Sequence, residues 1–133
     1  MIHEEICTYE VCKLAKDKGC PQHIGNDAYI VENEYDDEYE VGCCYPIQFI
    51  PDYLPTITAP SQSLLQRWLR EEKKIYIAIS VDIDHDLHRV CFEYGVCYDF
   101  DGRTMEYHNS YDSFGQYEDA LEDALKWTLE NLV

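Results

Sequence analysis

The chain contains 133 residues, of which 46% are hydrophobic and 28% are charged. This length and composition predict one globular domain and exclude wholesale disorder and collagen-like repetition. Its 27 acidic residues outnumber its 10 basic residues, so the net charge at neutral pH is −17. Such a charge repels phosphate backbones and anionic membranes, and we therefore expect no direct contact with nucleic acid or a membrane surface.

Neither a membrane span nor a secretory signal is expected. No apolar stretch approaches the roughly 20 residues that cross a bilayer, and residues 1–10 carry no basic and apolar regions typical of a signal peptide. We therefore expect a cytoplasmic protein. The seven cysteines are an odd number, and in that compartment they indicate reduced thiols rather than a disulfide framework.

The chain begins with signals for a helix and a strand. Thr8 can cap a helix over residues 9–18, and Gly19 followed by Pro21 ends it. The letters AYIVE at residues 28–32 then suit a short strand.

A second strand and a stiff connection are expected next. Residues 41–50 suit a strand, in which Pro46 indicates an edge position or a bulge. Three prolines within residues 51–60 predict an extended connection. We expect its apolar side chains to stay attached to the core, namely Tyr53, Leu54 and Ile57.

The middle of the chain predicts a helix and a central strand. Pro60 fits the first turn of the helix, whose buried stripe is formed by Leu64, Leu65, Trp68 and Leu69. Residues 75–83 alternate between isoleucine or valine and smaller or polar residues, the period of a strand, and we expect this strand at the centre of the sheet.

Two further strands continue this pattern. Residues 90–100 alternate in the same way, and Asp101 with Gly102 forms a tight turn that leads into residues 104–109. The three strands from residue 75 onward therefore predict an antiparallel meander.

A helix closes the chain. Ser113 and Gln116 suggest a capping box, and the apolar side of the helix is formed by Tyr117, Ala120, Leu121, Ala124, Leu125, Thr128 and Leu132. The whole order predicts a single α+β domain over residues 1–133. We expect one layer of antiparallel sheet with four to five strands, covered by about three helices.

Three segments resemble uncharacterised small proteins encoded by phages and mobile elements of Bacteroides-type gut bacteria. They are YEVCKLAKDKG at residues 9–19, TAPSQSLLQRWLREEKKIYIAI at residues 58–79 and YDSFGQYEDALEDALKWTLENL at residues 111–132. The resemblance implies a setting in a phage or mobile element. It carries over no activity and no residue role, because its motifs are capped amphipathic helices.

Residues 32–40 are the first candidate site, because six carboxylates alternate there with tyrosines. Tyrosine gives contact area at low entropy cost, so this surface suits a basic protein partner. A solvated hairpin tip that aids solubility is the simpler interpretation, and mimicry of duplex phosphates is another. The candidate residues are Glu32, Glu34, Tyr35, Asp36, Asp37, Glu38, Tyr39 and Glu40.

The second candidate is a ligand pocket between the sheet and the second helix. Trp68 beside Arg67 and Arg70 would stack a planar ligand there by aromatic and cation–π contact. A tryptophan at this spacing from Leu64 is also typical of a helix that simply packs on the core.

Metal binding is a weaker candidate. The letters DIDHDLH place oxygen and imidazole donors close together at Asp82, Asp84, His85, Asp86 and His88. They match no metal-ligand pattern, since the glycine and distal glutamate of an EF-hand are missing, and a polar hairpin turn explains them equally well.

Cysteine chemistry is weaker still. Zinc would need two closely spaced ligand pairs, and only Cys20 and His23 have that spacing, with Cys7, Cys12, Cys43 and Cys44 elsewhere. A nucleophilic thiolate would need Cys91 or Cys97 beside His108, without any third orienting group in view.

The sequence therefore favours a non-enzymatic protein-interaction or inhibitor module without a cofactor or metal. Its expected partner is a basic protein that contacts residues 32–40. Capture of a small ligand beside Trp68 is the alternative function. Edge strands and the 12 tyrosines favour a homodimer, whereas the net charge opposes one.

Overall fold

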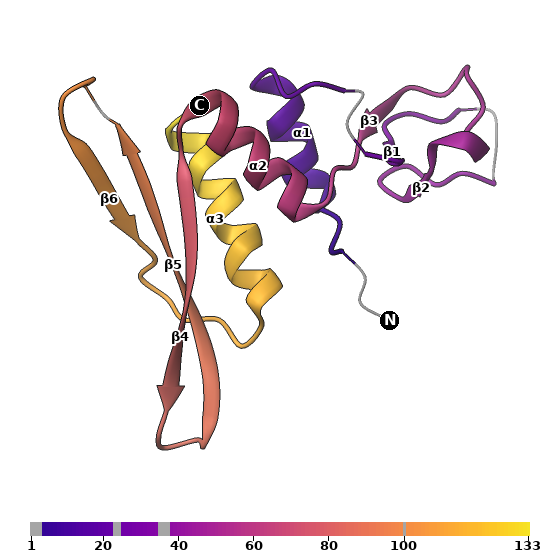
Figure 1. Ribbon diagram of the computed structural model, residues 1–133. Coiled ribbons are helices and arrows are strands. Elements are labelled where there is room, and N and C mark those ends of the chain that lie inside the picture. Colours follow the sequence, from indigo (N-terminus) through magenta and orange to yellow (C-terminus); the bar gives the residue numbers. More distant parts are fainter. Residues whose placement is uncertain (1–3, 23–24, 35–37, 100) are drawn as a thin grey trace. The chain divides into compact units, whose positions relative to one another are not determined.

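The computed structural model describes residues 4–22, 25–34, 38–99 and 101–133. These residues form an α+β protein of two compact units, which comprise residues 1–64 and 65–133 (Figure 1). The predicted class is confirmed, but the expected single sheet of four to five strands is wrong: each unit has its own three-stranded antiparallel sheet. Among the described residues, the strands therefore pair within each unit. That residues 1–133 fold as one domain stays a prediction.

Helix α1 (Tyr9–Asp17) opens the first unit as expected from its capping signals. The Thr8 hydroxyl accepts a hydrogen bond from the Val11 amide at 3.4 Å, and Gly19 adopts a φ of 93° just after the helix. Val11, Cys12 and Ala15 form its buried stripe, and α1 packs against β3.

The first sheet has the strand order β2–β1–β3, with β1 (Asp27–Ile30) in the centre. The predicted strand over residues 41–50 is wrong in length, because β2 (Cys44–Pro46) ends at its proline and the 3-10 helix η1 (Ile47–Phe49) follows. Pro46 lies on an edge strand, as expected, because its missing N–H costs no ladder bond there.

The proline-rich connection contributes more than a spacer. Its last part forms β3 (Thr56–Thr58), which pairs with β1. Leu54 and Ile57 are buried as predicted, but the Tyr53 side chain is 64% exposed. The expectation that Tyr53 belongs to the core is therefore wrong.

Helix α2 (Gln62–Lys73) begins two residues after Pro60, so this proline precedes the first turn instead of forming it. The Ser61 hydroxyl accepts from the Leu64 amide at 3.2 Å and so supplies the cap. Leu65 and Leu69 are fully buried, as the apolar stripe predicts.

The second sheet is the predicted meander of β4 (Tyr76–Asp84), β5 (Arg89–Asp99) and β6 (Met105–Asn109). Its order is β4–β5–β6, so β5 is the central strand and the prediction that residues 75–83 form the centre is wrong. Alternation reports that one face of a strand is buried, which an edge strand under a helix satisfies as well. Gly102 adopts a φ of 79° in the predicted turn before β6.

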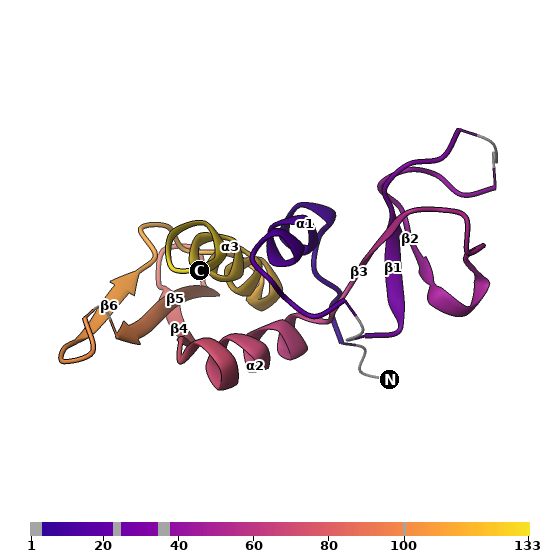
Figure 2. The ribbon, with the colours of Figure 1, turned by 90° about the horizontal axis from the view of Figure 1, so that it is seen from above.

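Helix α3 (Tyr117–Asn131) packs against β5 and β4, and Figure 2 shows it alongside their sheet. Gln116 is its N-cap residue without a side-chain hydrogen bond, so the predicted capping box with Ser113 is wrong. The buried side of the helix is formed by Ala120, Leu121, Ala124, Leu125, Thr128 and Leu129. In the described part of the chain, neither this helix nor a shorter one has the length and apolar character that a membrane crossing requires.

Candidate functional site

The acidic segment between β1 and β2 is described only at its two ends. Glu32, Glu34, Glu38 and Glu40 have exposed side chains there. The other predicted members lie outside the described residues, namely Tyr35, Asp36 and Asp37. The described carboxylates at both ends are therefore exposed to solvent, and binding of a partner to them stays a prediction.

Specific hydrogen bonds hold the two ends in place. The Asn33 side-chain amide donates to the Tyr39 carbonyl at 2.6 Å, which ties the beginning of the segment to its end. The Tyr39 hydroxyl donates to the Phe49 carbonyl at 2.6 Å, and its ring meets Tyr45 edge-on at 5.2 Å. The Glu40 amide donates to the Tyr45 hydroxyl at 3.0 Å. Tyr39 thus anchors the segment instead of only presenting its ring to solvent.

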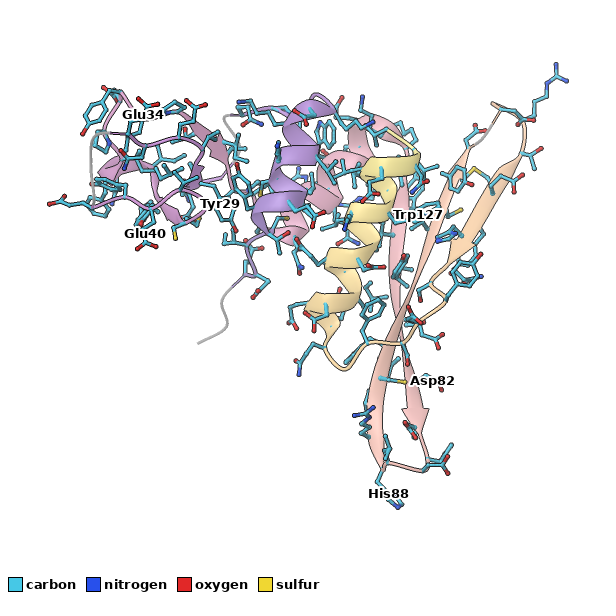
Figure 3. All side chains as sticks on the ribbon, turned by 180° about the vertical axis from the view of Figure 1, so that it is seen from behind. Tyr29, Glu34, Glu40, Asp82, His88 and Trp127 are labelled. Atoms are coloured by element: carbon cyan, nitrogen blue, oxygen red, sulfur yellow. The ribbon has the colours of Figure 1, made fainter. Side chains whose placement is uncertain are left out.

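The described carboxylates of this segment do not all lie together. Glu34 and Glu40 lie on different sides of the first unit (Figure 3). Glu40 accepts a weak hydrogen bond from the Cys43 thiol at 3.6 Å. Glu32 and Glu34 instead line a pocket of about 470 Å³ whose other walls are Asn33, Tyr53, Leu54 and Pro55.

Sequence reasoning missed the pocket partners of Glu32 and Glu34. Tyr53 and Pro55 come from a stretch that is about 20 residues further along the chain, and no local pattern connects the two. The one usable signal was a large aromatic residue between prolines, which favours exposure over burial in a strand. The aromatic contribution to this acidic surface therefore comes from Tyr53.

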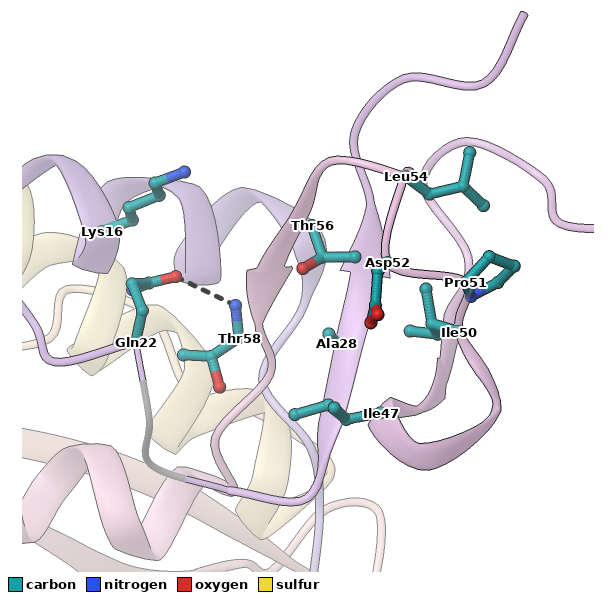
Figure 4. A pocket seen from close by; sticks show the side chains of 10 residues that line it. All are labelled: Lys16, Gln22, Ala28, Ile47, Ile50, Pro51, Asp52, Leu54, Thr56 and Thr58. Atoms are coloured by element: carbon teal, nitrogen blue, oxygen red, sulfur yellow. Dashed lines mark hydrogen bonds between the residues drawn. The ribbon is translucent and has the colours of Figure 1, made fainter. Parts of the chain in front are cut away.

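A second pocket lies in the same unit and is shown in Figure 4. It measures about 400 Å³, and its wall includes Lys16 from α1, Ala28 from β1 and Asp52 from the loop before β3. The Gln22 side-chain oxygen accepts from the Thr58 amide at 3.0 Å at one side of it. Its lining mixes aliphatic and polar groups and contains no candidate residue from the sequence.

The residues of the predicted ligand site beside α2 lie outside both of these pockets. Arg67, Trp68 and Arg70 line neither of the two pockets above. Arg67 pairs with Glu71 at 3.0 Å on the exposed side of α2, and the Lys73 ammonium lies 5.5 Å from the Trp68 ring centre. Lys73 already lies over one face of Trp68, so stacking of a ligand on that face would have to displace Lys73.

The DIDHDLH residues form the end of the β4–β5 hairpin, with Asp82 along it and His88 at its tip (Figure 3). One Asp84 carboxylate oxygen accepts from the amides of Asp86 and Leu87, each at 3.1 Å, and Asp82 accepts from the Ile83 amide at 2.8 Å. These carboxylates therefore stabilise the turn. Across the described residues, no three His, Cys, Asp or Glu side chains gather in a way that would hold a metal ion, so the candidate ligand set with His85 is not assembled.

His88→Gly is expected to raise the free energy of unfolding by about 0.5–1 kcal/mol, because His88 adopts a left-handed φ of 52° that glycine tolerates without strain. Urea unfolding at pH 7 measures the change. His85→Gly is the matched control in the same turn; it should lower stability, since glycine adds chain entropy there without relieving strain. An equal effect of both substitutions would show that the turn does not strain His88.

The cysteines are free thiols and do not form the suggested zinc ligand set. The Cys12 thiol donates to the Cys7 carbonyl at 3.6 Å. Burial raises the pKa of the Cys20 thiol to about 11, with a further contribution from Cys12 nearby. A raised pKa opposes the thiolate form that zinc and nucleophilic chemistry need. His23, the other half of the predicted pair, lies outside the described residues.

The suggested pairing of a cysteine with His108 is wrong. His108 pairs with Val96 across the sheet, whereas Cys97 pairs with Tyr107 and Cys91 with Asp82. Because successive residues of a strand point to opposite faces, Cys91 and Cys97 lie on the face opposite to His108. No thiolate–imidazole pair can form through the sheet.

His108 instead belongs to an aromatic cluster that sequence reasoning missed. Its ring stacks on Trp127 of α3 with centroids 3.6 Å apart and planes within 1°. Tyr94 lies beside it at 6.2 Å and donates a hydrogen bond to Asp123 at 2.9 Å. Burial and the Asp123 carboxylate raise the pKa of Tyr94, so its hydroxyl remains protonated. This cluster attaches α3 to the sheet.

No family model, curated protein or solved structure matches this chain. Among the sites above, the pocket beside Glu32 and Glu34 combines unsatisfied charge, an exposed aromatic ring and a concave shape. It is the strongest candidate for binding.

Proposed function

We propose that this protein is a non-enzymatic interaction or inhibitor module that binds a basic segment of another protein through the acidic pocket. The acidic pocket is formed by Glu32, Asn33, Glu34, Tyr53, Leu54 and Pro55. In line with the resemblance of its helices, we propose that it serves a phage or mobile element. We place it in the cytoplasm, where its seven free cysteines would stay reduced.

The composition of the acidic pocket supports a lysine or arginine side chain as its occupant. Such a side chain has an aliphatic stem and a charged end, and the pocket offers apolar walls at Leu54 and Pro55 with carboxylates at Glu32 and Glu34. The exposed Tyr53 ring gives the cation an aromatic face. Within the described residues, no ion pair engages either carboxylate.

The overall charge supports the same class of partner. A net charge of −17 attracts basic surfaces over a distance and raises the rate of encounter, while it repels acidic proteins and phosphates. The hydrogen bond from the Asn33 side chain to the Tyr39 carbonyl reduces the ordering cost of binding, because it holds Asn33, the residue between Glu32 and Glu34, before a partner arrives.

Binding of defined peptides tests this proposal. Fluorescent nine-residue peptides with two lysines or two arginines are titrated with the protein, and the same peptides with norleucine or glutamine at those positions serve as comparison. We expect the basic peptides to bind at least about tenfold more tightly and to weaken as salt rises from 50 to 300 mM.

Charge reversal locates the binding. Glu32→Lys with Glu34→Lys should weaken the basic peptides about tenfold or more. Glu93→Lys with Glu106→Lys is the matched control, because both residues are exposed in the second sheet and the net charge changes equally. Equal losses in the two double variants would mean that only the total charge matters, and the proposed pocket would be wrong.

The alternative of small-ligand capture beside Trp68 predicts a different result. Basic peptides would then bind no better than neutral ones, and Trp68→Ala would abolish retention of a planar ligand in equilibrium dialysis against a nucleotide panel. The Lys73 contact on the Trp68 ring favours the peptide proposal over this one.

A further inference from the structure

The outer edge of β4 has backbone groups that its own sheet does not use. Ile79 faces Tyr94 and Val81 faces Phe92 across the β4–β5 pair. The Tyr94 amide donates to the Ser110 hydroxyl at 3.1 Å, and the Tyr94 carbonyl accepts from the Ser110 amide at 2.9 Å. On the same side of β5, the amide and carbonyl of Phe92 bond to those of Phe114, each at 2.8 Å. In an antiparallel pair the N–H and C=O of one residue point to the same side of its strand. Because Tyr94 and Phe92 direct these groups away from β4, the residues opposite them, Ile79 and Val81, direct theirs away from β5 to the open edge.

Two side chains close part of this edge. The Gln66 amide donates to the Ile77 carbonyl at 3.0 Å, and the Asp82 carboxylate accepts from the Ile83 amide at 2.8 Å. No hydrogen bond among the described residues accounts for the outward groups of Ile79 and Val81. An exposed edge of this kind is a template for another strand.

The open backbone groups at the outer edge of β4 are self-complementary in one antiparallel register, the one centred on Ser80. There, Ile79 lies opposite Val81 of a second copy, and each donates to and accepts from the other. Ile77 lies opposite Ile83, so the Ile77 amide finds the Ile83 carbonyl. The two remaining groups of that pair, the Ile77 carbonyl and the Ile83 amide, are the ones that Gln66 and Asp82 already satisfy.

A shift of the two strands by two residues, which moves the centre of this register by one residue, leaves a group unpaired. Centred on Ile79, it would place the Val81 amide against the occupied Ile77 carbonyl. Centred on Val81, it would place the Ile79 carbonyl against the occupied Ile83 amide. Since an unpaired buried group is costly, the Ser80 register is favoured.

The side chains agree with the Ser80 register. Val81 and Ile83 are 65% and 57% exposed, because the hairpin extends beyond α3 (Figure 1). In the register they lie beside Ile79 and Ile77 of the second copy, on the same face. Their neighbour Asp82 meets an alanine, so carboxylates do not face one another across the pair.

Charge is also complementary along the pair. The antiparallel arrangement brings the hairpin end with Asp84 and Asp86 to the start of β4 in the second copy. Lys73 and Lys74 lie three and two residues before that start, and both are exposed. This local attraction offsets part of the repulsion between two chains of net charge −17.

We propose that two copies of this chain pair through their β4 edges, antiparallel and centred on Ser80, so that their second sheets become one continuous sheet. The pairing buries Val81 and Ile83 and uses the outward groups of Ile79 and Val81. It is independent of the acidic pocket and of the function proposed above.

Sedimentation velocity in 150 mM salt tests the pairing over 5–500 µM protein, where the wild-type chain should reach twice its 15.7 kDa mass. Val81→Pro removes an N–H that bonds to the second copy and that β5 does not use, so it should raise the dimer dissociation constant about tenfold or more. Val90→Lys is the control: it charges the same exposed face from β5, away from the edge, and should change the constant less than about threefold.

Amide hydrogen exchange of the wild-type chain gives a second readout that needs no variant. The amides of Ile77, Ile79 and Val81 should exchange about tenfold or more slowly at 500 µM than at 5 µM, whereas those of β6 stay unchanged. A wild-type chain that remains monomeric throughout would overturn the proposal. So would a dimer that Val90→Lys disrupts as strongly as Val81→Pro, or one that leaves the Ile79 and Val81 amides unprotected.

Discussion

Leu125→Ala is expected to lower the free energy of unfolding by about 2–5 kcal/mol. Leu125 is fully buried on α3. Truncation removes its transfer free energy and leaves a cavity that the close-packed surroundings can fill only in part. Urea unfolding followed by far-UV circular dichroism measures the loss.

Leu87→Ala is the matched control for this substitution. Leu87 lies at the tip of the β4–β5 hairpin with a side chain that is 59% exposed. The same chemical change there should alter stability by no more than about 0.5 kcal/mol. A small effect at Leu125, similar to that at Leu87, would contradict the core described for the second unit.

Trp127→Ala is expected to cost about 2–3 kcal/mol, less than a fully buried tryptophan because its ring is only partly covered. The substitution removes the stacked contact with His108 at 3.6 Å and the tilted contact with Tyr98 at 6.4 Å. Both partners belong to the second sheet, so α3 loses one of its attachments. Unfolding in urea, with Trp68 as the remaining fluorescent tryptophan, measures the cost.

A double-mutant cycle separates the stack from the rest of this effect. Trp127→Ala and His108→Ala should show a coupling energy of about 0.5–1.5 kcal/mol, because each substitution removes the same contact. Trp127→Ala combined with His85→Ala should be additive, since His85 lies at the hairpin tip. A coupling energy near zero in the first cycle would mean that the two rings contribute independently.

Much of the secondary structure followed from local signals. Thr8 and Gly19 were sufficient for the bounds of α1, and the alternation of residues 75–83 and 90–100 was sufficient for the long strands and their meander. Hydrogen bonds and turns within a few residues decide these features. Local patterns failed where a residue had two roles: Pro46 ended β2 early, and Ser113 resembled a cap without being one.

The candidate sites depended far more on distant residues. The acidic segment was visible as a charge pattern, but its pocket needs Tyr53 and Pro55 from another loop. The DIDHDLH letters suggested ligands until the Asp84 carboxylate was seen to bind the backbone of its own turn. His108 suggested a base for a cysteine, whereas the register of β5 and β6 places it on the other face, against Trp127.

The sequence by itself determined the α+β class, the helices and the C-terminal meander, because apolar period and capping act over a few residues. Only the tertiary structure decided that the strands form two sheets, that β4 lies at an edge with Ile79 and Val81 open, and that Tyr53 joins Glu32 and Glu34. Strand order and side-chain convergence depend on contacts between residues far apart in the chain. Periodicity reports which face of an element is covered, but not which element covers it.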